Sequence, residues 1–318
     1  MPSEFELIRR HFVRPTRHTE LAVGDDGAIV RPRPGMELVI STDMLVAGTH
    51  FFPDVNPEAL GWKALAVNVS DMAAMGAEPR WALLAISLPA ADEAWIAALA
   101  RGFFACAEAY GVDLIGGDTT RGPLNLAPTV FGEAPTGKSI RRSGARPGDE
   151  IWVSGSPGLA ALGLAHRQGR CVLIDPTPCL QALERPQPRV ALGLALRGIA
   201  TAAIDVSDGL FADLGHILEE SARGAEIDDG ALPWSSVRAA CSDEALSRAC
   251  LTGGGDDYEL VFTAPPAQHA AIVALAATLK LPLTPIGRII ASPAGQLLLK
   301  DSDDHEIPVG KRGFDHFG

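Results

Sequence analysis

Five short acidic segments, each beside glycine or a hydroxyl residue, are the clearest chemical signal in this 318-residue sequence. They are GDD at 24–26, STD at 41–43, GGDTT at 116–120, DVSDG at 205–209 and GGGDDYE at 253–259. A single such segment is typical of a turn, because glycine, aspartate and serine are common turn residues. Five together favour convergence on one hard cation, since glycine lets a ligand approach the backbone and hydroxyl groups add neutral oxygens.

A further carboxylate, Asp71, lies within the apolar run NVSDMAAMGA at 68–77. Leu60, Ala64 and Val67 precede it at helical spacing, which predicts that Asp71 lies on the buried face of a helix. A buried carboxylate without a partner is costly. Asp71 is therefore expected to be protonated, to pair with a base or to bind a metal ion.

Electrostatic repulsion favours the metal ion. Two carboxylates ~4 Å apart repel by roughly 4 kcal/mol at an effective dielectric constant of about 20, and a whole domain is stable by only about 5 to 15 kcal/mol. Aspartate and hydroxyl oxygens, without a histidine or cysteine cluster, are the ligands of Mg²⁺, which also binds substrate phosphates. The pattern predicts phosphoryl transfer in which several Mg²⁺ ions align donor and acceptor, with no side-chain nucleophile.

The segment GEAPTGKS at 132–139 satisfies the pattern of a phosphate-binding P-loop, but its context does not. A P-loop needs a helix directly after its lysine, because the free N–H groups of that helix hold the phosphates. Gly144, Pro147 and Gly148 follow Lys138 too closely for a sustained helix. We therefore expect a turn between two strands and no P-loop.

The acidic segments border apolar runs that predict a mixed α/β (α+β) fold. Strands are predicted at 38–45, 81–88, 114–120, 126–134, 151–157, 202–207, 258–264 and 286–290. Helices are predicted at 57–76, 92–110, 158–169 and 209–222. The polar segment 137–150, rich in Gly, Arg and Pro, predicts a boundary between domains 1–137 and 138–318.

Composition excludes several classes of protein. A net charge of -12 and a pI of about 5.1 disfavour nucleic acid and anionic membranes as partners. The five cysteines form no CxxC pair, which argues against a zinc site or a disulfide scaffold and fits a reducing cytoplasm. The N-terminal MPSEFELIRRHF is unlike a signal peptide, and no 18-residue apolar span occurs. A soluble cytoplasmic protein is expected.

The order of the acidic segments resembles the thiamine-monophosphate kinase family along nearly the whole chain. The segments that carry the resemblance are GDDGA (24–28), STDMLVAGTHF (41–51), KALAVNVSDMAAMGA (63–77), IGGDTTRG (115–122), RRSGARPGD (141–149), DVSDGL (205–210), GGGDDYELVFT (253–263) and GFDHF (313–317). That family belongs to the aminoimidazole-ribotide synthetase superfamily, whose ATP site uses no P-loop.

The resemblance implies a homodimer of two-domain subunits. The N-terminal domain would bind ATP and Mg²⁺ and form the dimer contact, and the C-terminal domain would complete the active site. The implied reaction transfers the ATP γ-phosphoryl group directly to the phosphate of thiamine monophosphate, giving thiamine diphosphate and ADP without a phosphoenzyme.

Site roles also follow from the resemblance, motif by motif. The implied Mg²⁺ ligands are Asp26, Ser41, Thr42, Asp43, Asp71, Asp118, Asp205 and Asp208. The implied ATP contacts are Gly117, Asp118, Arg142 and Ser207, with a further one among Arg101, Phe103 and Phe104. The implied contacts to thiamine monophosphate are His50, Asp256 and Phe314, since an aromatic face suits a cationic thiazolium ring and a carboxylate suits an aminopyrimidine.

One departure and two alternatives remain. Similar proteins often have Glu at the position of Asp256, and the shorter side chain would contact the substrate directly or through a water molecule. The first alternative is another enzyme of the superfamily, such as an ATP-dependent amidine ligase or a selenophosphate synthetase, although the latter needs a reactive Cys or selenocysteine well before Cys106. The second is a non-catalytic nucleotide-binding regulator.

Overall fold

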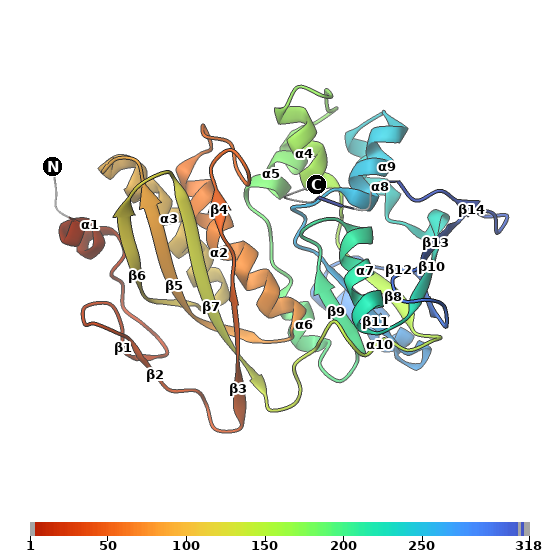
Figure 1. Ribbon diagram of the computed structural model, residues 1–318, viewed down its shortest axis with the longest axis horizontal. Helices are drawn as coiled ribbons and strands as arrows, with labels where there is room; N and C mark the ends of the chain where they lie inside the picture. Colours follow the sequence, from red (N-terminus) through yellow and green to blue (C-terminus); the bar gives the residue numbers. More distant parts are fainter. Residues whose placement is uncertain (1–3, 311–312, 315–318) are drawn as a thin grey trace. The chain divides into compact units, whose positions relative to one another are not determined.

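The computed structural model describes residues 4–310 and 313–314, which belong to two compact units (Figure 1). The first unit contains the residues up to Met72 together with Ala77–Gly137. The second contains Ala73–Gly76 together with the residues from Lys138 onward. Within the described ranges, no helix has the length and apolar character needed to cross a membrane.

The first unit is built on a five-stranded sheet. Its elements are α1 (Glu4–His11), β1 (Thr19–Leu21), β2 (Ile29–Val30), β3 (Met36–Thr42), β4 (Leu45–Val46), α2 (Pro57–Ala74), β5 (Glu78–Leu88), α3 (Glu93–Tyr110), β6 (Asp113–Arg121) and β7 (Asn125–Pro135). The long strands follow the order β3, β7, β5, β6, and β4 pairs with β7. α3 connects β5 to β6, which are parallel, and α2 and α3 lie on one face of the sheet (Figure 1). β1 and β2 form a separate hairpin.

Helices α2 and α3 pack with their backbones in close contact. A Cβ atom at Gly61 would overlap the carbonyl oxygen of Leu99, and one at Gly102 would overlap the carbonyl oxygen of Glu58. This approach is possible only because both positions lack side chains. All of 59–70 on α2 are buried, and the next residue of this helix, Asp71, is half-buried.

The second unit is built on a seven-stranded sheet of order β14, β13, β10, β12, β8, β11, β9. Its elements are β8 (Glu150–Ser154), α4 (Leu159–Arg167), α5 (Thr177–Glu184), α6 (Val190–Ala195), β9 (Ala202–Asp205), α7 (Leu210–Glu220), β10 (Gly224–Asp228), α8 (Trp234–Ala240), α9 (Glu244–Gly253), β11 (Leu260–Ala264), α10 (His269–Leu279), β12 (Leu283–Ile290), β13 (Leu297–Lys300) and β14 (Glu306–Ile307).

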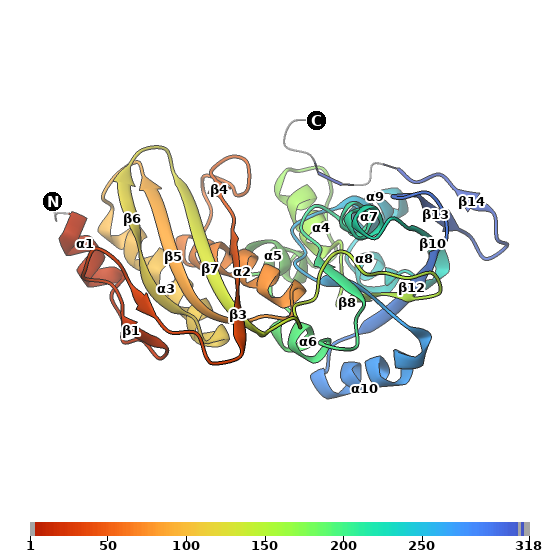
Figure 2. The ribbon, with the colours of Figure 1, turned by 60° about the horizontal axis from the view of Figure 1, so that its bottom comes forward.

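Three neighbouring strands of this second sheet, β8, β11 and β9, are buried on both faces. In β8, Ile151 and Val153 contribute to one hydrophobic core and Trp152 to the other. α4, α7, α8 and α9 supply residues to the first core, whereas α6 and α10 supply residues to the second, on the other side of the sheet (Figure 2). Two-sided burial explains why these strands are continuous apolar runs in the sequence, and it leaves the strand ends as the places for polar side chains.

Candidate active site

The end of β3 and the last turns of α2 bring a hydroxyl group and a carboxylate together. Ser41 Oγ donates a hydrogen bond to Asp71 Oδ2 at 2.6 Å, and the N–H of Asp43 donates to Asn68 Oδ1 at 2.9 Å. Asp71 is half-buried, although Val67 one turn earlier is buried. The expectation of a fully buried carboxylate is therefore wrong: Asp71 lies at the edge of the buried face and has a hydroxyl partner.

Thr42 and His50 lie close to this strand end in the sequence. Thr42 Oγ1 donates to the carbonyl oxygen of Pro128 at 2.9 Å and accepts from Thr129 Oγ1 at 3.1 Å, which leaves one lone pair of the hydroxyl for a ligand. His50 Nδ1 accepts the N–H of Val46 at 3.0 Å. In its neutral form, His50 therefore carries its proton on Nε2.

A cavity of about 1190 Å³ lies between the N-terminal segment and strands β5, β6 and β7. Three of the predicted residues, Asp26, Gly117 and Asp118, line it together with apolar side chains. Gly117 has a φ of 149°, and a Cβ atom there would overlap the carbonyl oxygen of Leu84. The position therefore requires glycine. Three exposed carboxylates, those of Asp25, Asp26 and Asp118, line this largely apolar cavity.

The predicted ATP contact on helix α3 is one of three residues, Arg101, Phe103 and Phe104, which differ in exposure. Phe103 is only 1% exposed, so its side chain belongs to the core. Arg101 is exposed and forms an ion pair with Glu58 at 3.3 Å, and Phe104 is half-buried. Of the three residues, Arg101 and Phe104 remain accessible to a ligand.

In the second unit, the loop that follows β9 contains three of the predicted residues. Asp205 ends the strand and is buried, whereas Ser207 and Asp208 are half-buried. Asp213 of α7 fixes the loop by hydrogen bonds. Its Oδ2 atom accepts three backbone N–H groups, those of Ser207 (3.0 Å), Asp208 (3.0 Å) and Gly209 (3.1 Å). This network fixes the backbone that presents Ser207 and Asp208.

The Asp213 carboxyl group is in an unfavourable place for a charge. Burial raises its pKa to about 7, and the neighbouring Asp208 carboxylate adds to this rise, although the three N–H donors oppose it. Asp213 is 2% exposed. The group therefore holds its proton over a pH range in which an ordinary aspartate is ionised.

The GGGDDYE loop and the C-terminal segment both contact this 205–209 loop. The N–H of Asp256 donates to the carbonyl oxygen of Ser207 at 2.8 Å, and the N–H of Phe314 donates to that of Asp208 at 3.0 Å. Asp256 has a φ of 70°, which is unusual for a residue with a side chain, and its Oδ1 accepts the Tyr258 hydroxyl at 3.1 Å. Phe314 is 53% exposed. The structure thus gathers Ser207, Asp208, Asp256 and Phe314 around one loop.

The other two acidic residues of GGGDDYE stabilise the fold around the loop. Asp257 accepts the N–H groups of Gly158 (2.7 Å) and Ala160 (3.4 Å) at the start of α4, and burial raises its pKa well above the ordinary value. Glu259 is 4% exposed and forms a two-pronged ion pair with Arg189, with Nε–Oε2 at 2.6 Å and Nη2–Oε1 at 2.5 Å. Asp257 and Glu259 thus support the fold, whereas Asp256 is half-buried and lies beside the 205–209 loop.

Arg142 lies in the segment between β7 and β8. Its side chain is exposed, and its carbonyl oxygen accepts the Ser221 hydroxyl at 3.3 Å. Lys138 lies in the segment 136–149, which contains no helix. The requirement for a P-loop is therefore not met, as the sequence predicts.

Comparison with known proteins gives a family for both units. The model for AIR synthase related protein, N-terminal domain, matches residues 24–134, and that for the C-terminal domain matches residues 146–300. A thiamine-monophosphate kinase from Salmonella typhimurium is 45% identical in an alignment 320 positions long, which covers 99% of this chain and 98% of the relative. The chain belongs to the thiamine-monophosphate kinase family.

Solved structures of the family have the same fold. The crystal structure of thiamine-monophosphate kinase from Stenotrophomonas maltophilia is 45% identical, with a TM-score of 0.83 over 94% of this chain and 95% of that chain. The structure of AaThiL complexed with AMPPCP and TMP is 30% identical, with a TM-score of 0.78 over 93% of this chain and 92% of that chain. The predicted mixed α/β fold and the predicted family resemblance are therefore confirmed.

Sequence reasoning missed the residues that hold the candidate site in shape. In this member of the thiamine-monophosphate kinase family they include Asp213 and the pair formed by Arg189 and Glu259. Asp213 had a signal, because an acidic residue in the first turn of a helix often binds backbone N–H groups. Arg189 had none, since 70 residues separate it from its partner.

Replacing Asp213 by Asn is expected to stabilise the second unit at high pH only. The native carboxyl group has a pKa of about 7, above the ordinary value of an unfolded aspartate. The free energy of unfolding therefore falls as pH rises from about 4 to 7, and above pH 7 the whole penalty of the buried charge is present. Asn keeps an oxygen for the three N–H donors and never ionises, so the variant should gain up to about 4 kcal/mol at roughly pH 8 and little at about pH 4.5. Urea unfolding without Mg²⁺ at both pH values measures this, and an equal difference at the two would contradict it.

Proposed function

We propose that this protein transfers the γ-phosphoryl group of ATP to the phosphate of thiamine monophosphate, giving thiamine diphosphate and ADP. The observation that carries the proposal is the identity of 45% to a thiamine-monophosphate kinase over essentially the full length of both chains. The structure of AaThiL complexed with AMPPCP and TMP supports the proposal, because this relative has the same fold and binds an ATP analogue. Transfer of a phosphoryl group needs cations beside the phosphates, and the carboxylates predicted in each unit are the groups that would bind those cations.

We propose that Mg²⁺ ions accompany the nucleotide. The donor set fits this ion, because the predicted ligands offer carboxylate and hydroxyl oxygens, and the Asp71 carboxylate is already paired with the Ser41 hydroxyl. The residues that would hold the ions are Asp26, Ser41, Thr42, Asp43, Asp71 and Asp118 in the first unit and Asp205 and Asp208 in the second. Bound Mg²⁺ would neutralise phosphate charge and that of the developing transition state.

The remaining predicted residues would position the two substrates. Gly117 lines the cavity proposed for the nucleotide, and Arg142 and Ser207 would supply a cation and a hydroxyl for its phosphates. On the acceptor side, the exposed ring of Phe314 suits the thiazolium cation, and Asp256 suits the aminopyrimidine. His50 would donate from Nε2 to the acceptor phosphate. Catalysis would then come from alignment and charge rather than from a covalent intermediate.

We further propose that the first unit forms a homodimer contact through β3. This strand lies at the end of the sheet order, and its side chains Leu38 and Ile40 are 41% and 57% exposed. An unpaired strand edge with apolar side chains favours association. Sedimentation velocity is expected to give a dimer, and Ile40→Lys should shift it towards monomer, because lysine resists burial at an edge. An unchanged dimer in this variant would contradict the proposed contact.

A coupled assay of ADP release tests the proposed reaction. With Mg²⁺ and ATP present, ADP formation should depend on thiamine monophosphate, and thiamine or aminoimidazole ribotide precursors should not replace it. ADP formation with a precursor instead would favour another enzyme of the superfamily. Stoichiometric ATP binding without ADP release would favour a regulator.

The free thiols of all five cysteines support the further expectation of a reducing compartment such as the cytoplasm.

A further inference from the structure

The segment 17–33, called here the N-terminal arm, carries Asp25 and Asp26 on a weakly supported hairpin. Its strands β1 and β2 have three and two residues, and the two acidic residues lie in the loop between them. Such a short two-stranded hairpin is barely stable by itself. Asp25 and Asp26 nevertheless line the cavity that Gly117 and Asp118 also line. Something outside the hairpin must therefore fix their position.

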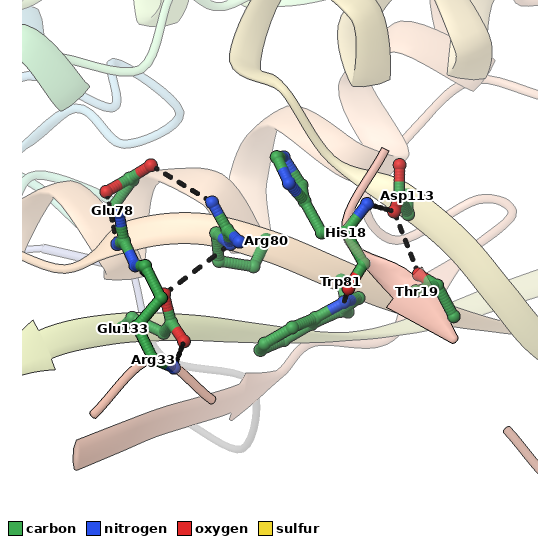
Figure 3. Close-up of polar contacts among 8 residues, drawn as sticks. All are labelled: His18, Thr19, Arg33, Glu78, Arg80, Trp81, Asp113 and Glu133. Carbon is green, nitrogen blue, oxygen red and sulfur yellow. Dashed lines mark hydrogen bonds and ion pairs between the residues drawn. The ribbon is translucent and has the colours of Figure 1, made fainter. Parts of the chain in front are cut away.

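One end of the arm is held by Asp113, the first residue of β6. Asp113 is 4% exposed. Its carboxylate accepts the N–H of Arg17 at 2.9 Å. It also accepts the N–H of His18 at 2.7 Å and the Thr19 hydroxyl at 2.8 Å (Figure 3). Trp81 Nε1 adds a bond to the carbonyl oxygen of His18 at 3.4 Å. A buried carboxylate thus fixes three consecutive residues where the arm begins.

The other end of the arm is held by Glu133 of β7, which is 0% exposed. Its carboxylate accepts both the backbone N–H of Arg33 at 2.7 Å and Arg33 Nε at 2.6 Å, and Arg80 Nε lies 3.5 Å away (Figure 3). Arg33 also pairs with Glu78 at 2.5 Å. The arm is therefore anchored at both ends to the sheet that forms the floor of the cavity.

We propose that Asp113 and Glu133 are positioning residues that set the place of Asp25 and Asp26 over the cavity for a nucleotide with its divalent cation. This rests on the proposed function. Fixing both ends of a segment removes the entropy that its loop would otherwise lose when a ligand binds. If either anchor is removed, the arm becomes ordered only when the ligand binds. The entropy lost in that ordering lowers the affinity for the ligand, whereas the rate of the chemical step in the bound state is unaltered.

The test compares Asp113→Asn and Glu133→Gln with a matched control, Glu244→Gln, which breaks an exposed ion pair with Arg238 in the second unit. Calorimetry with a non-hydrolysable ATP analogue and Mg²⁺ should show affinity lowered by about tenfold or more in the two variants and unchanged in the control. Hydrogen exchange in the peptides of 17–33 should rise in the same two variants. Turnover at saturating Mg²⁺ and ATP should stay within about threefold of the parent.

Milder variants keep the proposal falsifiable if a buried change prevents folding. Thr19→Val removes one of the bonds to Asp113, and Arg33→Gln removes the charge that faces Glu133; each should move affinity in the same direction by a smaller factor. Faster exchange of the arm with unchanged affinity would overturn the proposal, as would unchanged exchange. If the parent protein binds the analogue but does not phosphorylate thiamine monophosphate, the proposed function fails while the anchoring result still stands.

Discussion

Asp71→Asn is expected to lower turnover by roughly 10²- to 10³-fold while leaving the thermal unfolding temperature nearly unchanged. Asn has the same shape and retains an oxygen for the Ser41 hydroxyl, so the bond of 2.6 Å between α2 and β3 persists. The negative charge is lost, and with it the interaction that would hold a cation against the nucleotide. Steady-state kinetics at saturating ATP, with Mg²⁺ varied, measures the effect.

The matched control for this substitution is Asp92→Asn. Asp92 begins α3 by accepting the N–H groups of Ala94 and Trp95, and Asn serves equally well at that position. The control removes the same charge from the same unit and should leave turnover unchanged. Near-normal turnover of Asp71→Asn at moderate Mg²⁺ would refute the role assigned to Asp71.

Arg189→Met is expected to destabilise the second unit by about 3 to 5 kcal/mol. The substitution leaves the Glu259 carboxylate buried, with the Ser154 hydroxyl at 2.6 Å and the N–H of Ser156 at 3.2 Å but without a cation. The Arg189 side chain is 26% exposed and that of Glu259 is 6% exposed, so solvent cannot replace the lost partner. Urea unfolding followed by the fluorescence of Trp152, a core residue of the same unit, reports the change.

The double variant Arg189→Met with Glu259→Gln separates the pair from its burial. Gln keeps hydrogen bonds to the two serines without a charge, so the double variant should be more stable than Arg189→Met alone. Both variants should raise the KM for thiamine monophosphate, since the loop that carries Asp256 loses its anchor. A double variant that is less stable than Arg189→Met would show that the unpaired charge is not the cause.

Much of the fold was predictable because long apolar runs have few alternatives. The predicted helices at 57–76 and 92–110 correspond to α2 and α3, and the predicted strands at 81–88 and 126–134 to β5 and β7. Short elements were missed, among them α5, α6 and β10, because five to eight residues show little periodicity. Their conformations depend on packing against elements far away in the sequence.

Strand boundaries differed from the prediction for local chemical reasons. The predicted strand at 38–45 ends at Thr42, because the N–H of Asp43 bonds to Asn68 instead of to a neighbouring strand. The strand predicted at 286–290 begins at Leu283, and its register is irregular between Pro285 and Gly287, where proline has no N–H to donate. Composition alone reveals neither the hydrogen bond to Asn68 nor the irregular strand pairing beside Pro285.

The acidic segments of the candidate site could be recognised in the sequence, whereas the residues that support them could not. Aspartates beside glycine have a recognisable pattern, so Asp26, Asp118 and Asp208 could be named from the sequence alone. Their supports, such as Asp113 and Glu133, are ordinary acidic residues within strands, and their importance comes from N–H groups about 100 residues away. Only the folded chain reveals those donors.

The antiparallel pairing of β9 and β11 has a consequence for how this protein could diversify. Leu260 lies opposite Asp205, so the 205–209 loop and the GGGDDYE loop emerge from the same end of the sheet. Their separation is set by the spacing of adjacent strands, about 4.8 Å, which no side-chain substitution alters. If these loops bind the acceptor as proposed, substitutions within them would alter acceptor preference while the sheet keeps the two loops at the same separation.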